Sequence, residues 1–330
     1  MARINQLTVK TYGQFAHITF NDLIGEDPHF LDCIQMAYQA ARGNSTILLL
    51  GESGTGKDLF AQAIHNTSSR HHKPYIAINC AAIPRDLLGS ELFGYSDGAF
   101  TGAKRGGNPG KFELANGGTL FLDEIGEMPL EMQTVLLRII EDKKVTRIGG
   151  KDVIPVDVRI IAATNKDLRK EVEKGTFRGD LYYRLNVMTI PLPSLRQRRG
   201  DVPLLAMHFI QKTSAKLDKT INHIAPEIIM ALTLYDWPGN IRELENNIER
   251  MVNLAKDCRL EKNLLPPNIQ MITNNDLDLN NSRSLKDYGK SIEQTMIQFY
   301  INKNGGNATN AAKEMGISRS TLYRKLGKRL

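Results

Sequence analysis

The fold of this chain is decided by one glycine-rich stretch, Gly51-Glu52-Ser53-Gly54-Thr55-Gly56-Lys57. It follows the apolar run 47–50 and precedes a helical pattern that begins at Asp58. Glycines let the backbone fold around phosphate groups with its N–H groups pointing inward, and the N-terminus of a helix adds positive potential. A lysine at the position of Lys57 can reach the β- and γ-phosphates of a nucleotide. The order of strand, loop and helix therefore favours a nucleotide-binding loop over a glycine-rich turn that binds nothing.

The residue after the lysine departs from the usual pattern of such loops. Asp58 stands where a serine or threonine usually ligates magnesium. A carboxylate oxygen is also a hard ligand, and it can hold the metal directly or through a water molecule. We therefore predict Asp58 as a magnesium ligand.

Two acids complete the predicted nucleotide site. The apolar run 119–122 ends in Asp123 and Glu124, about 70 residues after the glycine-rich loop. We expect Asp123 to organise magnesium and Glu124 to orient or deprotonate the attacking water, although two acids after a strand can also begin a helix. Asn165 follows the apolar run 158–163. We expect it to place an amide beside the γ-phosphate, and a polar turn at a strand end is the alternative.

Short β-rich runs alternate with helical patterns between residues 21 and 189. The strand candidates are 47–50, 75–79, 119–122, 158–163 and 187–191. Alternation of this kind predicts an α/β fold, a parallel sheet with helices on both faces. Residues 202–216, 226–234 and 240–254 have helical patterns only, which predicts a small helical domain. The stretch 260–284 is rich in proline and asparagine and reads as a linker, and helical spacing returns over 285–300.

Composition and charge set limits on what the chain can be. Its 330 residues, 41% hydrophobic and 24% charged, are typical of a globular protein of about two domains. The apolar runs are too short for a membrane span, the first ten residues hold no signal core, and the three cysteines are far apart, so we expect a cytoplasmic protein with reduced thiols. Residues 303–330 hold seven basic residues and one acidic residue, so nearly all of the net charge of +7 lies there. A basic end of this kind favours nucleic-acid binding, and a solvated basic tail is the alternative.

One further string gives the chain a family resemblance. It is the hexapeptide Gly98-Ala99-Phe100-Thr101-Gly102-Ala103, which residues 91–94 (Glu-Leu-Phe-Gly) precede. By its residues alone it is a small, flexible loop with one exposed aromatic ring and a hydroxyl group. Together with the glycine-rich loop, it makes the chain resemble the AAA+ activators of sigma-54 RNA polymerase, also called bacterial enhancer-binding proteins. The resemblance covers about residues 20–330 and implies that this hexapeptide contacts sigma-54.

The resemblance assigns roles to further residues. The family commonly carries an acid after the lysine, so Asp58 is a mild variation. Asn79 matches the switch asparagine that restrains the catalytic glutamate, here Glu124, and a strand-end hydrogen bonder is the alternative. Residues 147–150 resemble the second surface loop, which supports the hexapeptide loop.

The resemblance also implies that arginines act between subunits. Residues 177–185 match the arginine-finger segment, so Arg178 and Arg184 would reach the γ-phosphate of a neighbouring subunit. The alternative is a salt bridge to a local acid such as Asp180. Residues 237–244 match the sensor segment of the lid, with Arg242 reporting the nucleotide state.

The basic C-terminal segment has the pattern of two helices joined by a glycine turn. Residues 307–326 resemble the Fis-type helix-turn-helix that ends these activators, and Ser318 is a candidate N-cap of the second helix. We expect the following residues to reach the major groove or the phosphates: Ser318, Arg319, Ser320, Thr321, Arg324 and Lys325. A helical hairpin used only for dimerisation is the alternative.

The predicted organisation is an AAA+ P-loop sheet with helices on both faces, a helical lid and a Fis-type helix-turn-helix. The expected divisions are 1–20 (remnant or linker), 21–193 (ATPase core), 194–258 (lid), 259–284 (linker) and 285–330 (DNA-binding domain). The resemblance implies a ring, expected to be a hexamer, that uses ATP and magnesium. Bound at upstream activating DNA, the ring would remodel closed complexes of sigma-54 RNA polymerase into open ones.

Two other functions are weaker candidates. A repressor-like regulator would bind DNA and nucleotide without remodelling polymerase, but the hexapeptide, Glu124 and both finger arginines argue against it. Another AAA+ machine, such as a helicase loader or a protease partner, leaves the hexapeptide and the Fis-like end without an explanation. Family members usually carry an N-terminal regulatory domain, and too few residues precede Asn21 for one. We therefore expect either control by a regulatory partner or a truncated form of a longer regulator.

Overall fold

The computed structural model describes residues 16–270 and, nearer the C-terminus, residues 297, 300, 301, 304, 306–315 and 317–325. The predicted remnant up to residue 15, most of the predicted linker and most of the helix predicted over 285–300 lie outside the described residues. The chain divides after Pro193 into two compact units, and the short segment Ile24–Asp27 belongs to the second. Among the described residues, no helix combines the length and the apolar character that a membrane crossing requires.

The first unit is built on a five-stranded parallel sheet. Its strands, in spatial order, are β2 (Tyr75–Asn79), β5 (Thr119–Asp123), β8 (Arg159–Thr164), β1 (Ile47–Leu50) and β9 (Met188–Pro191). Each begins and ends within one residue of its predicted bounds. Because all five run the same way, their carboxyl ends meet at one edge, where α/β proteins bind ligands. The register sets Asn79 beside Asp123, and Leu50 beside Thr164.

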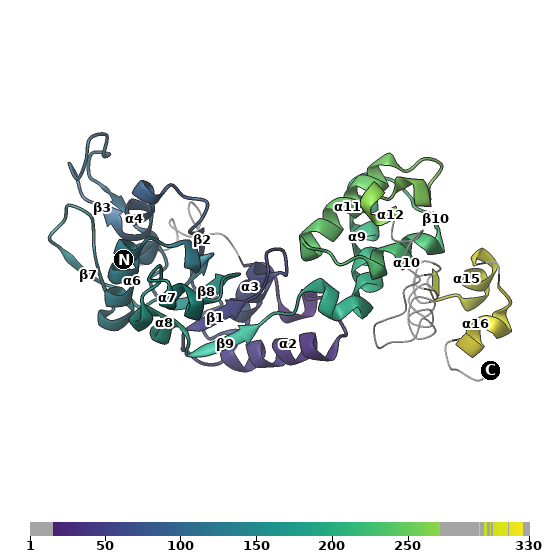
Figure 1. Ribbon diagram of the computed structural model, residues 1–330, viewed down its shortest axis with the longest axis horizontal. Helices are drawn as coiled ribbons and strands as arrows, with labels where there is room; N and C mark the ends of the chain where they lie inside the picture. The colour runs from purple at the N-terminus through teal and green to yellow at the C-terminus, as the bar shows by residue number, and fades with distance from the viewer. Residues whose placement is uncertain are drawn as a thin grey trace. The chain divides into compact units, whose positions relative to one another are not determined.

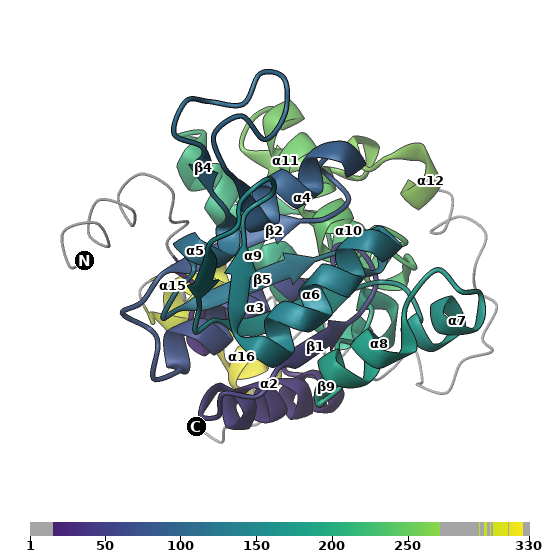
Figure 2. The same cartoon turned by 90° about the vertical axis from the view of Figure 1, so that its left-hand side faces the viewer.

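Helices cover both faces of this sheet, as predicted (Figures 1 and 2). They are α2 (Pro28–Ala41), α3 (Lys57–Thr67), α4 (Arg85–Phe93), α5 (Lys111–Leu114), α6 (Leu130–Asp142), α7 (Leu168–Glu173) and α8 (Gly179–Leu185). Neighbouring strand residues point to opposite faces. Ile47 and Leu49 therefore pack with α2 and α3, whereas Leu48 packs in a separate core with α4, α6 and α8. With two apolar faces buried, the strands read as continuous apolar runs in the sequence.

Two small hairpins extend this unit. Strand β3 (Gly94–Tyr95) pairs with β4 (Asn108–Pro109), and β6 (Lys144–Thr146) pairs with β7 (Val153–Pro155). Both pairs are antiparallel. The first hairpin carries the hexapeptide 98–103, and the second carries the loop 147–150.

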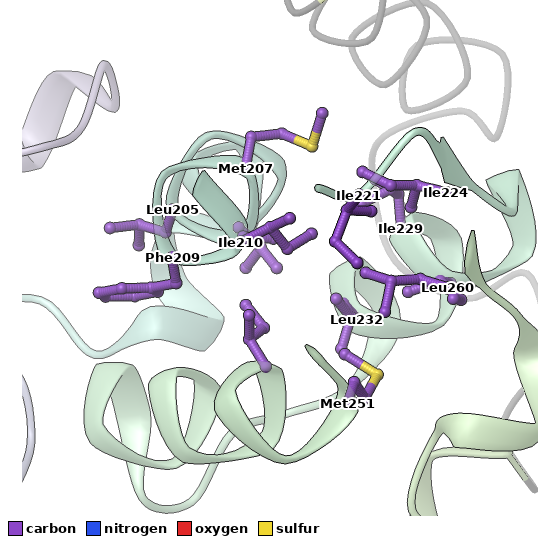
Figure 3. Close-up of a cluster of buried hydrophobic side chains, with 14 of the residues drawn as sticks. Leu205, Met207, Phe209, Ile210, Ile221, Ile224, Ile229, Leu232, Met251 and Leu260 are labelled. Atoms are coloured by element: carbon purple, nitrogen blue, oxygen red, sulfur yellow. The ribbon is translucent and has the colours of Figure 1, made fainter. Parts of the chain in front are cut away.

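The second unit is helical. Its elements after Pro193 up to residue 270 are η3 (Leu195–Asp201), α9 (Val202–Lys216), β10 (His223–Ile224), α10 (Pro226–Leu234), α11 (Asn240–Leu254), β11 (Arg259–Leu260), η4 (Lys262–Leu264) and α12 (Pro267–Gln270). The bounds of α9, α10 and α11 are those predicted. Their apolar faces meet in one core, where Ile210, Leu232, Met251 and Leu260 point toward one another (Figure 3).

The lid extends beyond its predicted end at residue 258. Strand β11 pairs with β10, and Leu260, Leu265 and Ile269 are fully or almost fully buried in the lid core. Residues 259–270 are therefore part of this domain and not of a linker. Their elements are two to four residues long, so the apolar side chains show no helical period in the sequence.

The C-terminal residues form the two predicted helices, α15 (Ala308–Glu314) and α16 (Arg319–Lys325). Asn307 caps the first, accepting hydrogen bonds from the N–H groups of Thr309 and Asn310. The hydroxyl of Ser318 accepts a 3.1 Å hydrogen bond from Thr321 N, which confirms it as the N-cap of the second.

Candidate active site

The glycine-rich loop joins β1 to α3 at the carboxyl edge of the sheet. Gly54 and Gly56 have left-handed backbones, with φ of 78° and 95°. The Thr55 hydroxyl donates to Glu52 O across 2.8 Å and closes the turn. Because glycine adopts positive φ without steric cost, the backbone here can wrap around phosphate groups. The predicted loop is thus present between the predicted strand and helix.

Lys57 begins α3 and is buried, with 6% of its surface exposed. Its ammonium group donates to Gly51 O at 2.9 Å and to Glu52 O at 3.2 Å. It also lies 3.7 Å from Glu124 Oε1. A buried charge needs such partners, and a bound phosphate would supply a stronger one. The structure therefore brings the loop lysine and the second predicted acid together.

Asp123 ends β5 and shares a hydrogen bond with the neighbouring strand. Asn79 Nδ2 donates to Asp123 Oδ2 at 2.9 Å, and Glu124 N donates to Asp123 Oδ1 at 3.0 Å. Burial raises the pKa of the Asp123 carboxyl, and the charge of Lys57 opposes that rise. The site thus holds a carboxylate beside a cation and an amide.

In this structure Asn79 binds Asp123, and the role of Asn79 in restraining Glu124 stays a prediction. Asn79 and Asp123 are direct register partners on parallel strands, so their side chains leave the sheet in the same direction. The other end of the Asn79 amide, Oδ1, accepts from Ala81 N and Ala82 N. The strand-end hydrogen bonding left open as the alternative is what the structure shows.

Glu124 leaves the strand through a strained turn. Its φ of 50° and ψ of 47° place a residue with a side chain in the left-handed region. Such a backbone costs about 1–3 kcal/mol and occurs preferentially at functional sites. The turn directs the carboxylate toward Lys57 and toward Asn165, whose backbone N–H lies 3.4 Å from Glu124 Oε2. Asn165 itself is exposed at the end of β8.

The residues present suit a magnesium ion. Asp58 is exposed on the first turn of α3, and its charge raises the pKa of Asp123 further. The described residues contain no group of three or more histidine, cysteine or acidic side chains that could hold a metal alone. Magnesium usually takes one or two carboxylates and completes its shell with water and phosphate oxygens. Asp123 and Asp58 provide ligands of that kind.

Both predicted finger arginines lie on the surface of the first unit and pair with acids of the same chain. Arg178 forms two hydrogen bonds to Asp180, of 3.0 and 2.7 Å, which raise the pKa of the guanidinium and lower that of the acid. Arg184 Nε lies 3.5 Å from Glu141 Oε1. Local salt bridges were the alternative stated for these residues, and in the single chain they are observed.

The hexapeptide forms the tip of the β3–β4 hairpin, and Figure 1 shows it extending away from β3 and α4. Gly98 and Gly102 have positive φ, and a side chain on either would meet nothing within 4 Å. Phe100 is 43% exposed and rests on Tyr95, with 5.0 Å between the ring centres. Thr101 is exposed. The tip thus presents an aromatic ring and a hydroxyl between two glycines whose left-handed backbone carries no side chain.

The loop 147–150 is bound directly to this hairpin. Ile148 N donates to Gly94 O, and Ser96 N donates to Ile148 O, each across 2.9 Å. A β-carbon on Gly149 would lie 2.9 Å from the side chain of Ala99. The base of the hexapeptide loop and the second loop therefore form one structural piece.

Two side chains that make structural contacts in the first unit were not predicted from the sequence. Arg147 holds Glu113 of α5 through two hydrogen bonds of 2.8 and 2.7 Å. Gln133 of α6 is completely buried, although it is polar. Its signal in the sequence is a polar residue three positions before Leu136 and seven before Ile140, on the same helical face.

The remaining predicted residues lie in the second unit. Arg242 is exposed on the first turn of α11. Just before α16, the Ser318 hydroxyl lies 2.9 Å from that of Ser320 and 2.7 Å from that of Thr321. The guanidinium of Arg319 lies 5.5 Å from the ring centre of Tyr323. Arg324 is exposed and Lys325 is partly buried.

Comparison with known proteins decides the family. Residues 23–191 match the family described as the Sigma-54 interaction domain. The chain belongs to the Sigma-54 interaction domain family. Residues 196–282 match the AAA+ ATPase lid domain, and residues 290–328 match the Fis family of bacterial regulatory proteins. The three matches confirm both the resemblance and the fold class predicted from the sequence.

Individual relatives agree with this family. A signal-transduction and transcriptional-control protein of Clostridium beijerinckii is 49% identical over 327 residues, covering 98% of this chain and 51% of the relative. The regulatory protein AtoC of Escherichia coli is 46% identical, covering 96% of this chain and 68% of AtoC. The crystal structure of NtrX from Brucella abortus in complex with ATP has a TM-score of 0.71 at 34% identity, covering 92% of this chain and 69% of NtrX. This Sigma-54 interaction domain protein thus spans about half the length of the Clostridium relative.

Proposed function

We propose that this chain is an ATP-hydrolysing transcriptional activator. It binds upstream DNA and remodels closed complexes of sigma-54 RNA polymerase into open ones through the loop 98–103. The observation that carries the proposal is the composition of the first unit. That unit joins a buried Lys57 and the acids Asp123 and Glu124 to a hairpin whose tip presents Phe100 and Thr101.

The residues of the loop 51–57 would hold the triphosphate. Their backbone N–H groups face the phosphates, and Lys57 exchanges the carbonyls of Gly51 and Glu52 for phosphate oxygens. Asp123, with Asp58 directly or through water, would hold a magnesium ion that neutralises charge on the phosphates. Glu124 orients the attacking water and accepts its proton, as a carboxylate held near the reacting group can.

Transition-state charge on the γ-phosphate would be stabilised from a second subunit. Arg178 and Arg184 exchange Asp180 and Glu141 for that phosphate when a neighbour presents it. A site completed by a neighbour requires a closed assembly, and we propose a hexameric ring. Arg242 reports from the lid whether the nucleotide is bound.

The residues that would contact sigma-54 and DNA are separate from the nucleotide site. Phe100 and Thr101 contact sigma-54, where an exposed aromatic ring suits the centre of an interface. Residues 318–321 with Arg324 and Lys325 bind DNA through its phosphates and the major groove. Such a protein acts where the polymerase is, in the cytoplasm, under the control of a regulatory partner or of further regulatory sequence.

A reconstituted promoter tests this function. The purified chain is incubated with sigma-54 RNA polymerase and promoter DNA, with ATP or with a non-hydrolysable analogue, and open complexes are measured by permanganate footprinting. We expect open complexes with ATP only, and specific protection of DNA upstream of the promoter. ATP hydrolysis without open complexes would contradict the proposal and favour a regulator that does not remodel polymerase.

A further inference from the structure

Gln133 is a buried polar side chain that the nucleotide chemistry above does not use. It is the fourth residue of α6, and none of its surface is exposed. Its amide nitrogen donates to Met128 O at 2.8 Å and to Thr176 O at 3.1 Å. Its amide oxygen accepts from Arg178 N at 2.8 Å. Both amide N–H groups and the carbonyl are therefore used.

These three bonds join two segments that are far apart in the sequence. Met128 ends the turn 125–128, which directly follows Asp123 and Glu124. Thr176 and Arg178 flank Phe177, which is buried, and Arg178 is the residue from which α8 begins. Thr134, the next residue of α6, binds the side chain of the same arginine. Its Oγ1 accepts a 3.3 Å hydrogen bond from Arg178 Nη1. One turn of α6 thus fixes both the peptide and the side chain of the predicted finger.

Burying the polar amide of Gln133 costs free energy, which indicates that its hydrogen bonds do more than fill space. An amide buried among apolar residues is tolerated only when its hydrogen bonds are made, and an apolar residue would fill the same space without that requirement. Here the amide reaches irregular backbone between α7 and α8, where the structure shows no backbone hydrogen bond to Thr176 O or from Arg178 N among the residues it describes. The bonds therefore set the position of one short peptide.

We propose that Gln133 is a positioning residue for the arginine finger, holding residues 176–178 against the turn that follows Glu124. The proposal rests on the function proposed for Arg178. A misplacement of about 1 Å at a reacting group can lower a rate on the order of a hundredfold. Because Arg178 acts on the ATP of a neighbour, the loss of Gln133 should impair the neighbour's site and spare the chain's own.

Two substitutions separate this role from nucleotide binding. Gln133→Met keeps the length of the side chain and removes all three hydrogen bonds. Gln133→Glu keeps an acceptor for Arg178 N and sets an oxygen against the carbonyls of Met128 and Thr176. For either variant we expect unchanged affinity for ATP, an unchanged KM and a kcat lowered on the order of a hundredfold. The second variant serves if the first does not fold, as judged by thermal unfolding.

Mixed assemblies then show where the defect lies. Gln133→Met subunits should regain ATPase activity with Lys57→Ala subunits, which lack a nucleotide site but keep an intact finger. They should gain nothing from Arg178→Ala subunits, because neither then has a working finger. The reverse pattern, or rescue by neither, would overturn the proposal, as would normal kcat in the pure variant.

A control pair separates this inference from the function on which it rests. Arg178→Ala subunits mixed with Lys57→Ala subunits should regain activity if the finger acts between subunits. Without that rescue, the role proposed for Arg178 fails and the role of Gln133 fails with it. With that rescue, the result for Gln133 stands or falls alone.

Discussion

Glu124 and Asp123 are adjacent acids that lie in different surroundings. Asp123 is held by Asn79 and by its own neighbour's N–H, whereas Glu124 turns through a left-handed backbone toward Lys57. Glu124→Gln should retain ATP binding, because the charge of Asp123 is kept, and should lose hydrolysis by orders of magnitude. Nucleotide titration and a steady-state ATPase assay on one preparation measure both. Normal turnover would remove Glu124 from the mechanism.

His65 makes the stability of the first unit depend on pH. It is buried, its Nδ1 lies 2.9 Å from Thr119 Oγ1, and burial followed by the nearby Arg159 charge lowers its pKa to about 4. Between about pH 6.5 and 4 the imidazole is mostly protonated in the unfolded protein and mostly neutral in the folded protein. The free energy of unfolding should therefore fall as the pH drops through this window, by at most about 1.4 kcal/mol per pH unit from this group.

Urea unfolding at pH 7 and pH 5, followed by circular dichroism, measures this effect. Above about pH 7.5 the group adds almost no pH dependence, because the imidazole is then neutral in both states. His65→Gln removes the titration, so its stability should change less between the two pH values than that of the parent, by about 2 kcal/mol. An equal change in both proteins would show that another group is responsible.

At the residue scale, the sequence predicts those site residues that short local motifs place, and it does not predict contacts between distant segments. Lys57, Asp123 and Glu124 could be predicted because short strings place them at the ends of strands. The partner of Asn79 could not, because it depends on the register between β2 and β5. The hydrogen bonds of Gln133 could not be predicted either, since they join α6 to a peptide more than forty residues away in the sequence.

At the scale of elements, we expect the loops 98–103 and 147–150 to depend on each other for their position. Gly149 has a φ of 71°, and its missing β-carbon would come within 2.9 Å of Ala99. Gly149→Ala should shift the hexapeptide loop, leave ATP hydrolysis within a few-fold of the parent and abolish open-complex formation. Gly117→Ala is the matched control, because its φ of 80° is similar and its β-carbon would meet nothing within 4 Å. Equal effects of both substitutions on transcription would point to backbone strain and not to the contact with Ala99.

The elements themselves differ in how well the sequence predicts them. Helix α10 begins at Pro226, and α11 follows the Trp-Pro-Gly breaker 237–239, so local signals mark their ends. Residues 259–270 form elements of only two to four residues, so local signals such as Pro267 do not show that they belong to the lid. Their membership in the lid depends on the burial of Leu260, Leu265 and Ile269 by helices that come earlier in the chain. Tertiary packing defines that boundary.

At the scale of the whole molecule, we propose that separate parts of the first unit carry out ATP hydrolysis and contact sigma-54. The ATPase chemistry is assigned to Lys57, Asp123 and Glu124 with fingers from a neighbour, and the contact with sigma-54 is assigned to the tip of the β3–β4 hairpin. The family match makes both assignments predictable from motifs. The contacts that hold the two loops together could not be predicted from the sequence, because they join residues that are far apart in the chain.

Thr101→Ala tests this separation most directly. The Thr101 hydroxyl is exposed on a glycine-flanked loop, and nothing in the proposed nucleotide chemistry uses it. ATPase rate and open-complex yield with sigma-54 RNA polymerase are measured on the same preparations of the parent chain and the variant. For the variant we predict ATP hydrolysis within a few-fold of the parent and no open complexes. Parallel loss of both activities, or retention of both, would contradict it.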